Sequence, residues 1–302
     1  MAHLRRVLGH GLAAAVLCLA AWLLFHQLKA ISLETLIAAI KATPSWRIAV
    51  ALAFTGVSFA ALASYDVIAV QVVAPDAVPL WGAVFAGAAA NAVSNTLGFH
   101  PITASAVRFR VYRRWGLSLP STGRVVALSW AALGLGFAGT LGGALLIDAP
   151  STTYRISGIV LALATGALVI WMTCAPRTVR VAGLTLDLPH GWRAVTQLGI
   201  GAIETGATIA ALYVLIPGGV THPSFPVFCL AFIGAVLLGI ASHAPGGVGV
   251  FEAAMLTLFP SGQAAFLAAL LLFRALYNLL PFVLAVLGLI LFELSWRAGK
   301  RG

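Results

Sequence analysis

The sequence predicts an all-α polytopic membrane protein in which six helices cross the membrane fully and two helical hairpins are re-entrant, arranged as an inverted-topology repeat. Three observations predict this fold class. Hydrophobic residues make up 61% of the chain and charged residues 9%, with a mean hydropathy of +1.02, a composition unlike that of soluble domains. Apolar segments of about 20 residues, the length of a spanning helix, recur from end to end. Most arginines lie at segment ends, where cytoplasmic loops are expected.

The six predicted crossings are continuous apolar segments. They cover residues 8–28, 46–73, 121–147, 154–174, 193–216 and 263–292. The first follows Arg5 and Arg6, and no convincing small-residue cleavage site comes after it, so we interpret it as a helix rather than a signal peptide. The longest breaks, 98–119 and 175–192, are loop-sized. We therefore expect a single transmembrane domain over residues 1–302.

Two further apolar stretches are interrupted. The first, over 81–115, is broken by the polar segment from Asn91 to Pro101. The second, over 225–259, is broken at Pro245, where three glycines lie close by. A proline with several glycines does not continue an ordinary membrane helix. Broken backbone at membrane depth is tolerated only where protein buries it or water reaches it.

The distribution of arginine predicts how the first interrupted stretch is inserted. Arg5 and Arg6 place the N-terminus in the cytoplasm. If 81–97 crossed fully, four arginines would lie outside: Arg108, Arg110, Arg113 and Arg114. A hairpin over 81–115 that enters and leaves on the same side keeps them in the cytoplasm.

A second hairpin over 225–259, entering from the opposite side, keeps Arg297 and the C-terminus in the cytoplasm as well. The halves, roughly 1–148 and 153–296, then run with opposite orientation. Many transporters use this inverted-repeat plan, with substrate sites at broken helices near the midplane.

Several function classes have little support. The net charge of +10 would suggest nucleic acid in a soluble protein, but here anionic lipid facing the cytoplasmic loops explains it better. Cys18, Cys174 and Cys229 form neither a disulfide framework nor a metal-ligand spacing. The glycine run follows no strand and lacks the lysine of a phosphate-binding loop. We expect no nucleic-acid partner, no metal, no cofactor and no enzyme activity.

Polar side chains nevertheless occur deep within the predicted spans. Glu204 and Arg274 each lie about 17 Å from the start of their spans, near the bilayer centre. Such residues usually mark substrate or ion pathways, although they also form ion pairs that fix the helix bundle. Both interpretations stay open. For the arginines at 108–114, two interpretations also stay open: loop charge that sets the topology, and contact with a phosphate. The candidate binding residues are Asp66, Asn91, Asn95, Arg108, Arg110, Glu204, Pro245, Gly246, Gly247, Glu252, Arg274, Tyr277 and Asn278.

Four segments together resemble a known family. They are Tyr65-Asp66, the stretch from Asn91 and Asn95 to Arg108 and Tyr112, the run Ser242 to Glu252, and the helix from Phe273 through Arg274 and Tyr277 to Pro281. In this order they resemble the lysylphosphatidylglycerol synthase transmembrane family, the flippase region of the bacterial multiple peptide resistance factor. Two departures stand out. Thr103 to Ala106 replace a frequent Gly-Gly, and Glu204 stands where the family tends to have an aspartate. The family's aminoacyl-transferase domain is missing, so lipid synthesis is not implied.

The resemblance implies a lipid flippase of the bacterial inner membrane that moves a phospholipid between leaflets, with an aminoacylated phosphatidylglycerol as one candidate. It implies that Arg108, Arg110 or Arg274 holds the phosphate, and that Glu252, Glu204 and Asp66 receive a cationic headgroup or balance those arginines. A helix N-terminus after Pro245 would add backbone donors. Membrane phospholipids are the expected partners, with a separate lipid-modifying enzyme and a second copy of the chain as further ones. The alternatives are an ion or small-solute transporter, and a non-transporting partner of that enzyme.

Overall fold

The computed structural model describes residues 33–98, 100–181, 183–218, 220, 222–242 and 244–298. The predicted crossing over 8–28 lies outside them. The elements are α2 (Leu33–Ala42), α3 (Ser45–Val73), α4 (Leu80–Leu97), α5 (His100–Tyr112), η1 (Arg113–Trp115), α6 (Leu119–Ile147), α7 (Thr152–Cys174), β1 (Arg177–Val181), β2 (Leu184–Leu188), α8 (Trp192–Tyr213), α9 (Phe225–Ala241), η2 (Pro245–Gly247), α10 (Val250–Leu258), α11 (Gln263–Phe273), η3 (Arg274–Leu279) and α12 (Leu280–Ala298).

Five helical spans in the described part of the chain are long and apolar enough to cross a membrane. They are Ser45–Val73, Leu119–Ile147, Thr152–Cys174, Trp192–Tyr213 and Gln263–Trp296. Each coincides with one of the predicted crossings. The protein is therefore a helical membrane protein with several spans, as the composition predicts.

Both interrupted stretches are broken as predicted. α4 ends at Gly98, whose φ of 75° reverses the chain into α5, and these two helices pack against each other. α9 is separated from α10 by the short turn η2, in which Gly246 and Gly247 have φ values of 60° and 64°. Such positive φ angles are open to glycine and strained for other residues, so the glycines are what permits the second break.

A small β-hairpin corrects the expectation of a plain loop over 175–192. β1 and β2 pair antiparallel, with Arg177 opposite Leu188 and Val181 opposite Leu184. Gly183, with a φ of 80°, lies in the connecting turn. Polar and apolar residues alternate from Thr178 to Val181 and through β2. This is the pattern of a half-buried strand, and the arginines obscured it.

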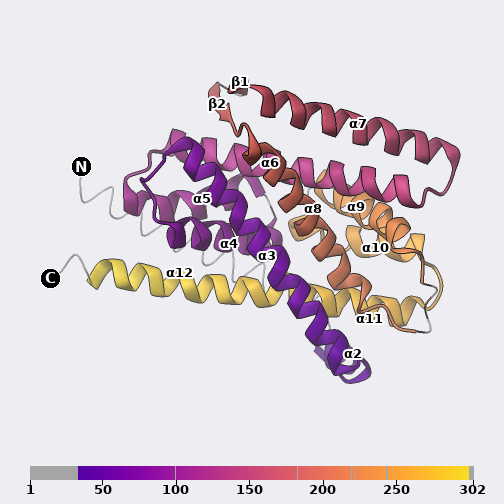
Figure 1. The fold of residues 1–302 in the computed structure, drawn as a ribbon. Helices are drawn as coiled ribbons and strands as arrows, with labels where there is room; N and C mark the ends of the chain where they lie inside the picture. The colour runs from indigo at the N-terminus through magenta and orange to yellow at the C-terminus, as the bar shows by residue number, and fades with distance from the viewer. Residues whose placement is uncertain are drawn as a thin grey trace.

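The two broken helix pairs lie at opposite ends of the helix bundle (Figure 1). The pair α4/α5 lies at the end that carries the β-hairpin and the C-terminus, and the pair α9/α10 lies at the other end. Between them α3 and α8 cross the molecule and pack against each other. The continuous helix from α11 to α12 runs along both pairs.

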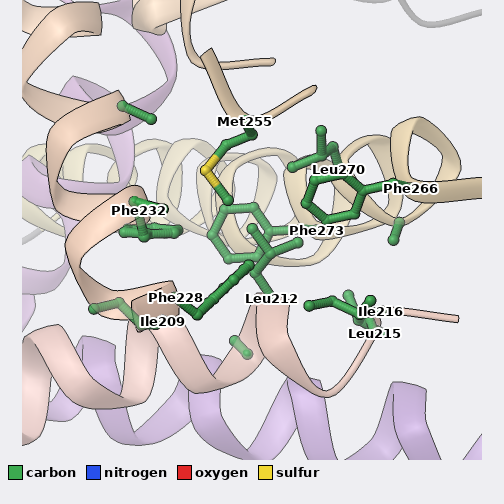
Figure 2. Packing of buried hydrophobic residues seen from close by; sticks show 14 of the residues in the cluster. Ile209, Leu212, Leu215, Ile216, Phe228, Phe232, Met255, Phe266, Leu270 and Phe273 are labelled. Atoms are coloured by element: carbon green, nitrogen blue, oxygen red, sulfur yellow. The ribbon is translucent and has the colours of Figure 1, made fainter. Parts of the chain in front are cut away.

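The largest apolar cluster fixes the α9/α10 pair to the bundle. Phenylalanines from α9 and α11 pack with leucines and isoleucines from the C-terminal part of α8 and with Met255 of α10 (Figure 2). Phe232, for example, meets Phe251 and Phe273 edge to face, with ring centroids 5.3 and 6.0 Å apart. Without a hydrophobic driving force between helices in lipid, such close packing is a main source of their association.

α6 and α8 approach each other closely through two glycines. A Cβ atom on Gly136 would lie 2.7 Å from the Cα atom of Gly201, so no side chain fits at this crossing. Small residues that let backbones meet are the usual device of membrane helices. The contact fixes α8 one turn before Glu204.

Candidate functional site

The centre of the candidate site is one π-helical turn, η3, inside the long last helix. π-helical turns are rare and occur often at functional sites. Three polar side chains of this turn are buried: Arg274, Tyr277 and Asn278. Each contacts a different part of the protein, so this single turn connects both broken helix pairs with the middle of α8.

Tyr277 joins a cluster of hydroxyl groups around Glu204. The Tyr277 hydroxyl lies 2.9 Å from Ser58 Oγ and 2.8 Å from Thr208 Oγ1. Thr208 also donates to Glu204 Oε1 at 3.1 Å. Thr205 donates to the other carboxyl oxygen, Oε2, at 3.1 Å. Among the described residues, Glu204 is hydrogen-bonded only by neutral groups and has no ion pair, although it is 4% exposed.

Arg274 holds the break of the second helix pair together. Its Nε donates to Glu252 Oε1 at 2.7 Å, and its Nη1 donates to the carbonyl of Gly246 at 2.6 Å. A longer contact, 3.4 Å, reaches the carbonyl of Gly247. The guanidinium also stacks over the Phe251 ring at 5.3 Å. One arginine thus satisfies carbonyls that the broken backbone leaves without helical partners.

Glu252 also caps the helix that follows the break. Its Oε2 accepts a hydrogen bond from the backbone N–H of Gly249 at 2.7 Å, at the N-terminus of α10. A carboxylate at this position is favoured by the helix dipole. The backbone donor that we expected to be open to a phosphate at this helix end is therefore used by the protein's own carboxylate.

Asn278 connects the same turn to the first helix pair. Its Nδ2 donates to the backbone carbonyl of Asn95 at 3.1 Å, and Thr96 Oγ1 donates to the carbonyl of Asn278 at 3.0 Å. The contact lies at the end of α4, next to its break. Asn91, one turn earlier, instead donates to Gly87 within its own helix at 2.8 Å.

Asp66 and Arg108 form a separate, fully buried ion pair between α3 and α5. Arg108 donates through Nε to Asp66 Oδ1 at 2.8 Å and through Nη2 to Asp66 Oδ2 at 2.6 Å. The Tyr112 hydroxyl donates to the same carboxylate at 2.7 Å. The side chains are 0% and 1% exposed for Asp66 and Arg108. This bidentate geometry satisfies both charges, as burial requires.

Arg110 lies on the outside of the same helix. It forms an ion pair with Glu293 of α12, and its guanidinium lies 5.2 Å from the centre of the Trp296 ring. The Arg110 side chain is 47% exposed. This arginine therefore belongs to the surface at the end of the bundle and not to the central site.

The structure brings most of the predicted site residues together around η3. They are Asn95, Glu204, Gly246, Gly247, Glu252, Arg274, Tyr277 and Asn278. Asp66, Arg108 and Arg110 form two other ion pairs, Asn91 bonds its own helix, and Pro245 begins η2. Ser58, Thr205 and Tyr112 were not among the predicted site residues. Ser58 and Thr205 are ordinary small polar residues in apolar helices, a type that mostly bonds its own backbone.

The fold and this buried polar site define the class as a polytopic membrane protein with two broken helix pairs. No family model matches the chain. It is similar to an uncharacterized protein, slr0712, of Synechocystis (29% identity over 294 residues, covering 89% of this chain and 86% of that protein). It is also similar to the inner membrane protein YbhN of Escherichia coli (30% identity over 202 residues, covering 62% of each chain).

Proposed function

We propose that this protein is a phospholipid flippase of the bacterial inner membrane, of the lysylphosphatidylglycerol synthase transmembrane family. The observation that supports it best is the buried Glu204 carboxyl, surrounded by hydroxyls and paired with no arginine among the described residues. Of the three buried acids in the described part of the chain, two are already matched by arginines. Glu204 is the acid left to meet a cationic group from outside the protein.

The energetic cost of Glu204 argues for a function. An ionised carboxyl in the middle of a membrane helix costs about 2.5–3.5 kcal/mol on insertion scales. Hydroxyl donors from Ser58, Thr205 and Thr208 offset part of this cost without cancelling the charge. The Tyr65 hydroxyl is also buried, and it has no hydrogen-bond partner within the described ranges. It lies close to Gly201, one turn before Glu204. Hydrogen-bonding groups that the fold itself does not satisfy are expected along the path of a polar lipid headgroup.

The π-helical turn gives a physical route from the central acid to both broken helix pairs. Arg274 contacts the η2 break, and Asn278 contacts the end of α4. The two pairs lie at opposite ends of the bundle (Figure 1), in agreement with hairpins that enter from opposite sides. We propose that the hairpins open in turn and that η3 couples them, with both termini in the cytoplasm.

Arg274 is the best candidate for the phosphate of the lipid. Its Nη2 makes only the long contact to Gly247, so part of its donor capacity is weakly used. Arg108 is committed to Asp66 through two nitrogens and would bind phosphate only after that pair opens. The similarity to YbhN, which is described as an inner membrane protein, supports the proposed location. Phosphatidylglycerol with an aminoacyl group has both the phosphate that Arg274 would bind and the cation that Glu204 would bind.

The proposal is tested by leaflet exchange in liposomes that contain the protein and headgroup-labelled lipids. Glu204→Gln keeps the shape and removes the charge, so we expect exchange of an aminoacylated phosphatidylglycerol to fall at least tenfold. Arg113→Ala, at an exposed arginine without a role in the site, is the matched control and should exchange as the wild type does. Wild-type exchange no faster than that of empty liposomes for every lipid tested would end the flippase proposal.

A second candidate is an ion or small-solute transporter. The specific observation in its favour is the small size of the Glu204 cluster, which is lined by hydroxyls as a proton or cation site would be. Its distinguishing test is flux of protons or alkali cations into the same liposomes in the absence of lipid exchange. Flux that disappears in Glu204→Gln, with unaccelerated lipid exchange in the wild type, would favour this candidate.

A further inference from the structure

A groove distinct from the η3 site opens along the outside of the bundle between α6, α7 and α8. Its volume is about 440 Å³, within the range of small-molecule sites. Its walls are mostly apolar, with residues such as Leu128 and Leu135 of α6, Leu168 and Met172 of α7, and Leu188 of β2. α7 carries many exposed apolar side chains beside it, including Leu163 and Ile170, so this side of the molecule faces lipid.

One polar group in the groove lacks a partner. Gln197 of α8 lines the groove and is 2% exposed, yet its Nε2 has no hydrogen-bond partner among the described residues. A buried amide donor left unsatisfied costs about 1–3 kcal/mol. The chain therefore holds a donor that a bound molecule would satisfy, in a mostly apolar groove.

Three arginines, which do not line this groove themselves, each lie one helical turn or one strand pairing from a residue that does. Arg124 precedes Leu128 by one helical turn on α6, and Arg193 precedes Gln197 by one turn on α8, so each pair shares a helix face. Arg177 is paired with Leu188 across the β-hairpin. The Nε atoms of all three arginines are buried, and no residue in the described part of the chain hydrogen-bonds to them.

The opposite end of the groove is mostly apolar, with Thr165 as its polar lining residue. It runs along α6 from Leu128 to Ala138, about 15 Å along the helix axis, and Ala164 of α7 lies at its far end. The groove thus offers a positive end, then an amide donor one turn further in, then an apolar channel. This order matches the parts of an anionic phospholipid. The phosphate meets the arginines, the ester carbonyl meets Gln197, and an acyl chain fills the channel.

We infer that this groove is a binding site for an anionic phospholipid, separate from the route proposed through η3. Basic pockets between membrane helices on the cytoplasmic side are known to bind anionic headgroups. The predicted orientation places this end of the bundle in the cytoplasm, where the arginines accumulate. The inference goes beyond the proposed function, because binding here requires no transport.

Lipid binding to the full-length protein in detergent, measured by native mass spectrometry, tests the inference. The probes are phosphatidylglycerol and phosphatidylcholine with the same acyl chains, together with inorganic phosphate as a competitor. We expect phosphatidylglycerol to be retained at least tenfold better than phosphatidylcholine. Phosphate at millimolar concentration should not displace it, because free phosphate has no acyl chain for the channel.

Two sets of variants separate this site from other lipid contacts. Gly134→Phe fills the groove from α6, where an added side chain meets no atom within 4 Å at its Cβ, and should abolish retention. Gly143→Phe, on the same helix and equally open at its Cβ, is the matched control and should retain the lipid. The triple variant Arg124→Ala, Arg177→Ala, Arg193→Ala should lose the preference for phosphatidylglycerol, whereas Arg113→Ala should keep it.

Three outcomes would overturn the inference: equal retention of both lipids by the wild type, displacement by free phosphate, or unchanged retention in Gly134→Phe. Thermal unfolding in the same detergent shows that each variant is folded. Glu204→Gln should still retain phosphatidylglycerol, so failure of this inference and failure of the flippase proposal are distinguishable.

Discussion

Buried charges in this protein fall into two kinds, and the difference lies in their immediate neighbours. Asp66 and Glu252 each face an arginine at 2.6–2.7 Å, and their remaining lone pairs accept from a tyrosine or a backbone N–H. Glu204 faces only hydroxyls. The first kind is neutralised within the protein and holds helices together. The second kind has no partner of opposite charge among the described residues.

The Asp66–Arg108 pair makes a sharp stability prediction. Asp66→Asn removes the negative charge and leaves a buried guanidinium uncompensated, which should lower the free energy of unfolding by about 3–5 kcal/mol. Glu293→Gln, at the partly exposed pair with Arg110, is the control and should cost about 1 kcal/mol or less. Denaturant titration in detergent micelles measures both. Equal, small losses would show that the buried pair is not holding α3 and α5 together.

At the scale of elements, α6 and α8 approach each other closely at a glycine crossing. A Cβ on Gly201 would lie 2.5 Å from the Cα of Gly136, which is backbone and cannot move aside cheaply. We expect Gly201→Ala to destabilise the protein by about 1–3 kcal/mol through overpacking.

Gly199→Ala supplies the matched control for this crossing. It lies in the same helix with no atom within 4 Å of the added Cβ, so the higher helix propensity of alanine should stabilise by about 0.5–1 kcal/mol. The two variants should therefore change the stability in opposite directions. Thermal unfolding in a single detergent measures both changes. A Gly201→Ala protein as stable as Gly199→Ala would contradict the tight crossing.

The sequence predicts the helices well and the contacts between side chains poorly, for physical reasons. Apolar length sets where α3, α6 and α7 begin and end, and proline with glycine sets the breaks. The choice of Arg108 as the partner of Asp66 depends on tertiary packing that no spacing reveals. The short β-hairpin was missed because its arginines resemble loop charge, and the convergence on η3 was missed because a π-turn has no clear sequence signature.

At the scale of the whole molecule, the placement of the two broken helix pairs at opposite ends of the bundle predicts its orientation. In a chain whose own cysteines are replaced, Arg113→Cys should react with a membrane-impermeant maleimide only after the membrane is permeabilised. Gln263→Cys, at the exposed first residue of α11, should react in intact cells. Labelling of both from the same side would rule out hairpins that enter from opposite sides.

The carboxylate of Glu252 performs two tasks at once, because one oxygen holds Arg274 and the other holds the backbone N–H of Gly249, which precedes α10. A single rotation of that side chain would release both donors in the same instant. Under the flippase proposal, an incoming anion would then find the guanidinium and the helix N-terminus free together, so that binding of the anion would loosen the kinked segment in the same step.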